Sequence, residues 1–137
     1  MLKVRGKPTH PEHAHLLVFP TRENYDISHI LTTIKQSVAK KAIPFVRNNA
    51  PDFLVQMSDR QPNGKVTIRF WQRGGGYDRN LWTPRDVWEK IDYIHNNPVK
   101  RNLAVTPAQW PWSSAADFAG STNGPLPIDF ETLPKRV

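Results

Sequence analysis

Two histidines separated by one residue are the first feature of the chain that could support chemistry. His13 and His15 enclose Ala14 just before the apolar run Leu-Leu-Val-Phe. Side chains two residues apart on a β-strand point to the same face, with Cα atoms roughly 6.5 to 7 Å apart. Imidazoles so placed could bind one divalent metal ion. They could also be two surface histidines on an edge strand, and the spacing leaves both alternatives open.

A tyrosine and an asparagine one helical turn apart form a second pair. With about 100° per residue on a helix, Val87, Ile91 and Ile94 fall within one narrow arc that is expected to face the core. Tyr93 and Asn97 lie about 40° from each other and outside that arc. The helix would therefore present a phenol and an amide together. The alternative is a tyrosine at the rim of the core and an asparagine that ends the helix.

Together the two pairs suggest metal-assisted chemistry on a phosphodiester. A phenol with a pKa near 10 is a weak nucleophile at neutral pH. It becomes effective when a metal polarises the phosphate and holds it in line. Two imidazoles and one amide oxygen would leave metal positions open for phosphate oxygens and water. The expected cofactor is a divalent metal, Mg²⁺ or Mn²⁺, and imidazole ligands suit Mn²⁺ better.

Composition and charge limit the class of protein. The 137 residues correspond to about one domain, and the lack of cysteine excludes disulfides, thiolate zinc sites and thiol catalysis. No apolar run could span a membrane and no signal peptide is recognisable, so we expect a cytoplasmic protein without a membrane partner. The formal net charge of +7 favours a polyanion such as nucleic acid, although solubility alone also explains a basic domain.

The elements that must position the first pair lie in the N-terminal third. Residues 13–19 are typical of a buried strand that ends at Pro20, and residues 1–6 could add one short strand. Apolar residues at helical spacing predict a helix from Ile27, with Asp26 as its N-cap. Pro44 should end this helix.

The middle of the chain predicts a short helix and a strand. After Pro51, a short helix through Met57 is favoured over a strand at 53–57. An Asn-Gly turn at 63–64 then precedes an alternating strand at 65–71.

A second long helix should carry Tyr93. Thr83 as cap, followed by Pro84 and Asp86, is a strong helix start. This helix should end at about Asn96, because Pro98 disfavours helical geometry in the residue before it. Residues 121–137 are expected to form a flexible tail.

Five stretches, in order along the chain, resemble one family. They include His-Ala-His and Tyr-Ile-His-Asn-Asn-Pro, span most of residues 9–120, and lie at 11–18, 30–41, 70–80, 93–101 and 110–115. Through them the sequence resembles the single-tyrosine HUH transposases, most closely the REP-associated tyrosine transposases. The resemblance implies an α+β fold with a ferredoxin-like palm, of the type also seen in RRM domains: an antiparallel sheet with helices on one face.

The resemblance also implies an activity and its residues. Tyr93 would be the catalytic nucleophile, while His13, His15 and Asn97 would bind the divalent metal. The tyrosine would attack single-stranded hairpin DNA and leave a 5′-phosphotyrosine link and a free 3′-OH, which a later strand transfer would reverse. The protein would act as a monomer or a homodimer.

The basic residues around the implied site could contact DNA phosphates. They are Lys35, Arg73, Arg79, Lys100 and Arg101. Each could instead be an ordinary solvated charge.

The resemblance is incomplete at the N-terminus. Family members carry a strand and a helix before the histidine strand, and these elements are absent here. We therefore expect residues 1–120 to form an N-terminally truncated transposase-like domain. The alternative function is a catalytically inactive, DNA-binding remnant of such an enzyme.

Overall fold

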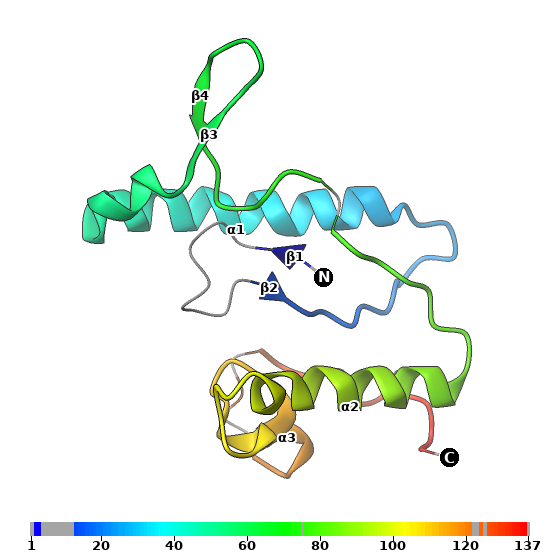
Figure 1. Cartoon of the computed structure of the whole chain (residues 1–137). Coiled ribbons are helices and arrows are strands. Elements are labelled where there is room, and N and C mark those ends of the chain that lie inside the picture. Colours follow the sequence, from blue (N-terminus) through cyan, green and yellow to red (C-terminus); the bar gives the residue numbers. More distant parts are fainter. Residues whose placement is uncertain (1, 4–12, 75, 122–123, 125, 137) are drawn as a thin grey trace. The chain divides into compact units, whose positions relative to one another are not determined.

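The computed structural model describes residues 2–3, 13–74, 76–121, 124 and 126–136. Helices and antiparallel strands are both present (Figure 1), which confirms the α+β class. The chain divides into two compact units, Met1–Asp78 and Arg79–Val137, which are described separately below. Among the described residues, no helix combines the length and apolarity that crossing a membrane requires.

The observed strand is much shorter than predicted and contains only the first of the two histidines, with His15 directly after its end. Strand β2 covers only His13–Ala14 and pairs antiparallel with β1, Leu2–Lys3, in the register Leu2↔Ala14 and Lys3↔His13. The expectation of a buried strand over 13–19 is wrong, because residues 16–19 are non-strand and 41 to 66% exposed. Their apolar sequence favours a strand, but within the described residues no other strand pairs with this stretch.

Helix α1, Ile27–Asn49, begins as predicted and ends later. Asp26 caps it by accepting a hydrogen bond from the Ser28 amide at 2.8 Å. Pro44 lies inside the helix, so the prediction that it ends there is wrong. A proline removes one intrahelical hydrogen bond and bends the chain, and the residues that follow it restore the helical pattern. The end is at Ala50, whose amide donates to the Val46 carbonyl at 2.8 Å.

A short helical turn connects α1 to a hairpin. Residues Pro51–Val55 form the 3₁₀ helix η1. A short helix is the favoured prediction for this segment, and the alternative strand at 53–57 is not formed. Strands β3, Ser58–Arg60, and β4, Val66–Ile68, then pair antiparallel with Asp59 opposite Thr67. The turn contains Gly64, whose φ of +79° is left-handed and favours glycine. The strand predicted over 65–71 is thus present but shorter.

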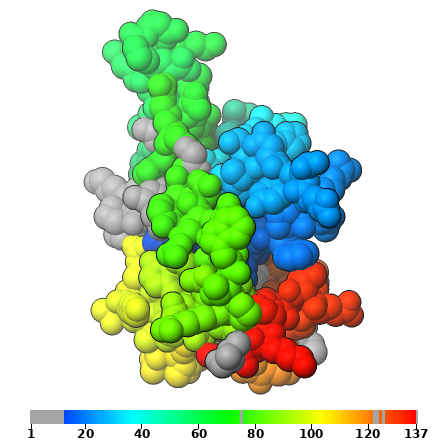
Figure 2. Space-filling view, turned by 90° about the vertical axis from the view of Figure 1, so that its right-hand side faces the viewer, coloured from blue at the N-terminus to red at the C-terminus, as the bar shows by residue number. Residues whose placement is uncertain are grey.

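The hairpin has two chemically different faces. Side chains alternate along a strand, so Met57 and Asp59 project to one face and Ser58 and Arg60 to the other. Met57 is only 1% exposed and Asp59 is also buried, whereas Arg60 is exposed. The hairpin projects away from α1 (Figures 1 and 2). The described strands form two separate two-stranded sheets, β1–β2 and β3–β4.

Helix α2, Pro84–Lys100, starts at the predicted capping box. The Thr83 hydroxyl accepts from the Asp86 amide at 3.1 Å, and the Asp86 carboxylate accepts from the Thr83 amide at 3.2 Å. The hydrogen bond from the Thr83 side chain lowers the pKa of Asp86 below its ordinary value.

The predicted end of α2 at Asn96 is wrong, because the helix continues through a buried Pro98 to Lys100. Its end is a Schellman motif: the Leu103 amide donates to the Pro98 carbonyl at 2.9 Å, and the Asn102 amide donates to the Val99 carbonyl at 3.0 Å. Asn102 has a φ of +56°, which asparagine tolerates in this position.

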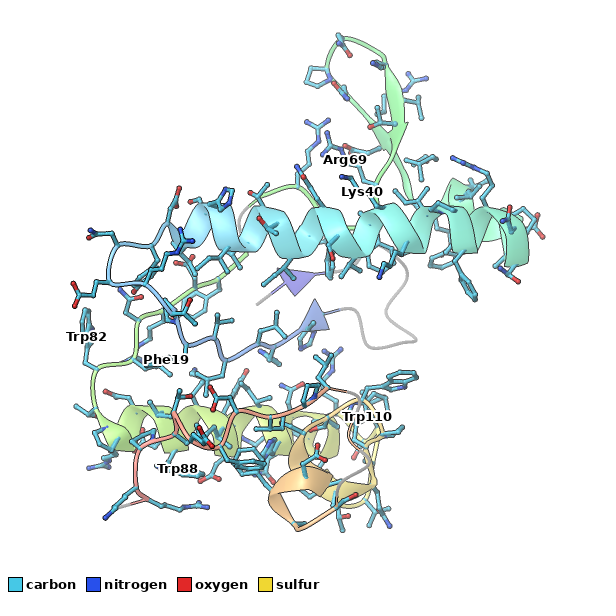
Figure 3. All side chains as sticks on the ribbon, turned by 180° about the vertical axis from the view of Figure 1, so that it is seen from behind. Phe19, Lys40, Arg69, Trp82, Trp88 and Trp110 are labelled. Carbon is cyan, nitrogen blue, oxygen red and sulfur yellow. The ribbon has the colours of Figure 1, made fainter. Side chains whose placement is uncertain are left out.

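The second unit packs around the inner face of α2. Ile91, His95 and Ala115 are buried, and the ring of Phe118 on helix α3, Ala115–Phe118, lies 4.9 Å from that of His95 and 6.0 Å from that of Trp88. Helix η2, Pro107–Gln109, precedes α3. Trp88 is marked in Figure 3 on the side of α2 that carries these contacts.

The C-terminal segment returns to α2. Its described residues contain no helix or strand, and two of them bond to side chains of α2. The Trp88 indole donates to the Pro134 carbonyl at 3.0 Å, and the Arg136 guanidinium donates to the Asp92 carboxylate at 2.8 Å. Described parts of this segment therefore belong to the second unit.

Candidate active site and basic surface

The two histidines lie together in the first unit. Pairing of β2 with β1 places both imidazoles in a half-buried position, with ring centroids 4.9 Å apart and ring planes at 83°. Two imidazoles that bind one metal ion through bonds of about 2.1 Å have ring centroids about 5 Å apart. The two rings make an edge-to-face contact, at a distance that is also compatible with two ligands of a shared cation.

A cation at this pair would need additional donors. Among the described residues, no group of three or more His, Asp or Glu side chains is arranged to hold a metal. An amide oxygen and phosphate oxygens of a bound ligand are donors of a different type, and both suit Mn²⁺ or Mg²⁺.

Tyr93 and Asn97 lie in the second unit, on one helix. The Tyr93 side chain is on the outside of α2, since the residue is 42% exposed, and Asn97 follows one turn later in a half-buried position. The helical-wheel prediction that Tyr93 is not needed for the core is confirmed, because Ile91 and His95 are the buried residues on either side of it.

Two lysines flank the Tyr93 ring. The ammonium group of Lys90 lies 4.9 Å from the ring centroid, and that of Lys100 lies 5.7 Å from it. These are cation–π distances. The face of α2 with Tyr93 and Asn97 therefore carries two positive charges beside the phenol. We call these four residues the tyrosine face of α2.

Lys90 was not among the residues predicted from the sequence, although a signal for it exists. It precedes Tyr93 by three positions, which places the two about 60° apart on a helix. The same wheel that pairs Tyr93 with Asn97 thus also includes Lys90.

His95 is a structural histidine rather than a metal ligand. Its Nε2 atom lies 2.9 Å from the Ser114 hydroxyl, and its ring packs against Phe118. Burial lowers the pKa of His95, and the negative charge of Asp92 partly opposes this effect. The neutral imidazole is therefore the form that fits the core of the second unit.

The predicted DNA-contacting residues fall into two groups. Lys35 and Arg73 are in the first unit: Lys35 donates to the Gly74 carbonyl at 2.7 Å, and Arg73 pairs with Asp59. In the second unit, Lys100 and Arg101 lie at the end of α2, and the guanidinium of Arg79 is 4.0 Å from the Asp86 carboxylate.

The segment that follows the hairpin, from Trp71 to Gly74, is hydrogen-bonded to α1, and we call it the glycine loop. Besides the bond from Lys35 to Gly74, the Trp71 indole donates to the Lys35 carbonyl at 2.8 Å. Gly74 has a φ of +100°, so its left-handed backbone, not a lack of space, requires glycine. The loop is thereby held next to the residues that bind Asp59.

Comparison with family models, with curated proteins and with solved structures returns no match for this chain. Functional inference consequently depends on the residues and contacts described above.

Proposed function

We propose that the protein is a metal-dependent enzyme that cleaves and rejoins single-stranded hairpin DNA through a covalent bond to Tyr93. A ferredoxin-like palm of the single-tyrosine HUH transposases is part of this proposal. The proposal combines the resemblance of five ordered sequence stretches with the chemistry of two residue groups, the histidine pair and the tyrosine face of α2.

The observation that carries the proposal is the environment of Tyr93. A tyrosine that only filled space at the rim of a core would not need two ammonium groups at 4.9 and 5.7 Å from its ring. A phosphodiester that approaches the exposed phenol would meet these charges first, because opposite charges attract over several ångströms. Lys90 and Lys100 would then hold the phosphate close to the Tyr93 hydroxyl.

In the proposed reaction, the Tyr93 oxygen attacks the phosphorus atom of the bound strand. The phenol loses its proton, a bond forms between the tyrosine oxygen and phosphorus, and the bond from phosphorus to the 3′ oxygen breaks. The 3′ oxygen takes up a proton and leaves as a hydroxyl group. Rejoining reverses these steps, with a 3′-OH as the attacking group.

His13, His15 and Asn97 would hold the divalent metal in this proposal. The metal would polarise the phosphate and neutralise charge that develops on its oxygens. The two imidazole rings are in contact, with centroids 4.9 Å apart, and Asn97 lies one turn from the proposed nucleophile on α2; both support the proposal. Lys90 and Lys100 supply positive charge on the side of the phenol itself.

A gel assay with labelled DNA tests the proposal. The protein is incubated with hairpin-bearing single-stranded DNA and Mn²⁺, and covalent adducts are separated under denaturing conditions. We expect an adduct with the wild-type protein and with Tyr25→Phe, which removes another exposed phenol, and none with Tyr93→Phe. An adduct at wild-type yield in Tyr93→Phe would contradict the proposal, as would salt-dependent binding without any adduct, which would support the inactive DNA-binding alternative.

A further inference from the structure

A buried carboxylate in the first unit binds two arginines at once. Oδ2 of Asp59 lies 2.9 Å from Nε of Arg69 and 2.7 Å from Nε of Arg73. The Asp59 side chain is 10% exposed, while the side chains of Arg69 and Arg73 are 42% and 47% exposed. The Asp59 carboxylate is therefore buried, whereas the side chains of both arginines are partly exposed to solvent.

The hairpin explains how these residues meet. Asp59 is opposite Thr67 in the β3–β4 ladder, so Arg69, two residues beyond Thr67, belongs to the same face. The Arg69 amide extends the ladder by donating to the Met57 carbonyl at 2.9 Å. Arg69 is marked in Figure 3 where the hairpin meets α1. Arg73 reaches the same carboxylate from the start of the glycine loop, which Lys35 and Trp71 hold against α1.

The group keeps positive charge and donors for a ligand. Two guanidinium groups share one carboxylate, which leaves a net charge of about +1 before Lys35 is counted. Both ion pairs are made at the Nε atom, whereas a guanidinium has four further N–H donors on its two terminal nitrogens. Both side chains are half-exposed, and arginine suits phosphate, which it binds in a bidentate manner.

We propose that Asp59 orients Arg69 and Arg73 as a two-arginine clamp for adjacent phosphate groups of single-stranded DNA. Asp59 is a positioning residue, because it acts through the arginines. The clamp deepens the proposed function by naming where the first unit holds the strand, and it rests on that function for the identity of its ligand. Ion pairing that served only to stabilise the hairpin would not require two half-exposed guanidinium groups on a single oxygen.

A binding titration without metal tests the clamp separately from cleavage. The probe is a fluorescent oligothymidylate of about 15 nucleotides, within the usual site size of a small single-strand-binding domain. Its anisotropy is followed with the full chain in EDTA over a range of salt concentrations. Each phosphate contact on a single strand contributes about 0.7 to the slope of log K against log salt.

The decisive variants remove equal positive charge from the Asp59 group and from the rest of the hairpin. Arg69→Gln with Arg73→Gln should lower the salt slope by about 1.4, the value for two phosphate contacts. The matched control is Arg60→Gln with Lys65→Gln, which also removes two positive charges from this hairpin but leaves the Asp59 group intact. We expect the control to change the slope much less. Equal changes in the two double variants would overturn the clamp and indicate diffuse attraction.

Asp59→Asn distinguishes orientation from charge. Losing a negative charge should by itself strengthen binding to DNA, whereas releasing both arginines should weaken it by about fivefold or more, the cost of ordering two long side chains again on binding. Weaker binding therefore supports the clamp, and unchanged or stronger binding by a folded variant contradicts it. If Asp59→Asn does not fold, as circular dichroism would show, the exposed-arginine pair still decides the question.

One further comparison distinguishes free phosphate from the DNA backbone as the ligand. Another distinguishes failure of the clamp from failure of the cleavage proposal. Inorganic phosphate at constant ionic strength should displace the oligonucleotide only weakly, and complete displacement by it would contradict a site for the DNA backbone. A normal clamp result with no Tyr93 adduct would disprove the cleavage proposal alone. A normal adduct with no difference between the double variants would disprove the clamp alone.

Discussion

The two long helices of the molecule differ in what they bury. None of the 23 residues of α1 is buried, whereas α2 buries Ile91, His95 and Pro98. Each helix contains a proline, but Pro44 is exposed and Pro98 is buried at a Schellman end. The comparison shows that α2 is held by its unit's core, while α1 is held mainly by its own backbone and a few polar bonds such as those of Lys35 and Trp71.

An isoleucine-to-alanine substitution in each helix should show the largest difference in lost stability between α1 and α2. Ile91→Ala should destabilise α2 by about 3 kcal/mol, because it leaves a cavity in the core. Ile34→Ala, at a half-buried position of α1, should cost about 1 kcal/mol, because little apolar surface is lost. Hydrogen exchange of peptides from each helix measures both values. Equal losses would show that α1 has a core comparable to that of α2.

Removing the N-cap of each helix should show a smaller difference in lost stability between α1 and α2. Thr83→Ala removes the capping box and should destabilise α2 by about 1 kcal/mol. Asp26→Ala should destabilise α1 by no more than that, because Asp26 caps through the Ser28 amide, whereas Thr83 and Asp86 bond each other reciprocally. Amide exchange in the first turn of each helix is the measurement. A greater loss of protection in Asp26→Ala than in Thr83→Ala would contradict this prediction.

The sequence predicts the starts of both helices well and their ends poorly. Each start is fixed by local side chains, Asp26 or the Thr83–Asp86 pair, so it is visible in a few residues. Each end depends on whether a proline terminates the helix, and this is decided by the following residues. Pro44 is tolerated because one missing hydrogen bond costs less than abandoning the turn that follows it. Pro98 lies in the last turn, where only Val99 and Lys100 follow before the Schellman end.

The positions of the strands could not be predicted from sequence composition. Residues 16–19 have a strong strand composition but lie outside any described strand, whereas Ser58–Arg60 has no apolar alternation and is β3. Pairing requires a partner with free backbone groups, and composition does not reveal it. The exposed Tyr93 follows from helical periodicity, but the link from Asp59 to Arg69 and Arg73 depends on the hairpin register.

The smallest expected effect is on the pH dependence of the second unit. Burial lowers the pKa of His95 and Asp92 partly offsets this, so the folded form binds a proton less readily than the unfolded form, whose pKa is near 6.5. Stability is thus fully present above about pH 6.5 and decreases as the pH falls below it. Protection factors of α2 amides, corrected for the intrinsic exchange rate at each pH, should fall in this range in the wild type but not in His95→Gln. Identical pH profiles in the two proteins would contradict this role for His95.

The most direct test of the central claim is the identity of the residue that carries DNA after cleavage. Trypsin should release residues 91–100 as one peptide, in which Tyr93 is the only tyrosine. After reaction with hairpin DNA and Mn²⁺ and digestion of the DNA, mass spectrometry should find this peptide with a nucleotide attached to Tyr93. A nucleotide on any other peptide, or cleaved DNA with no modified peptide, would contradict the account.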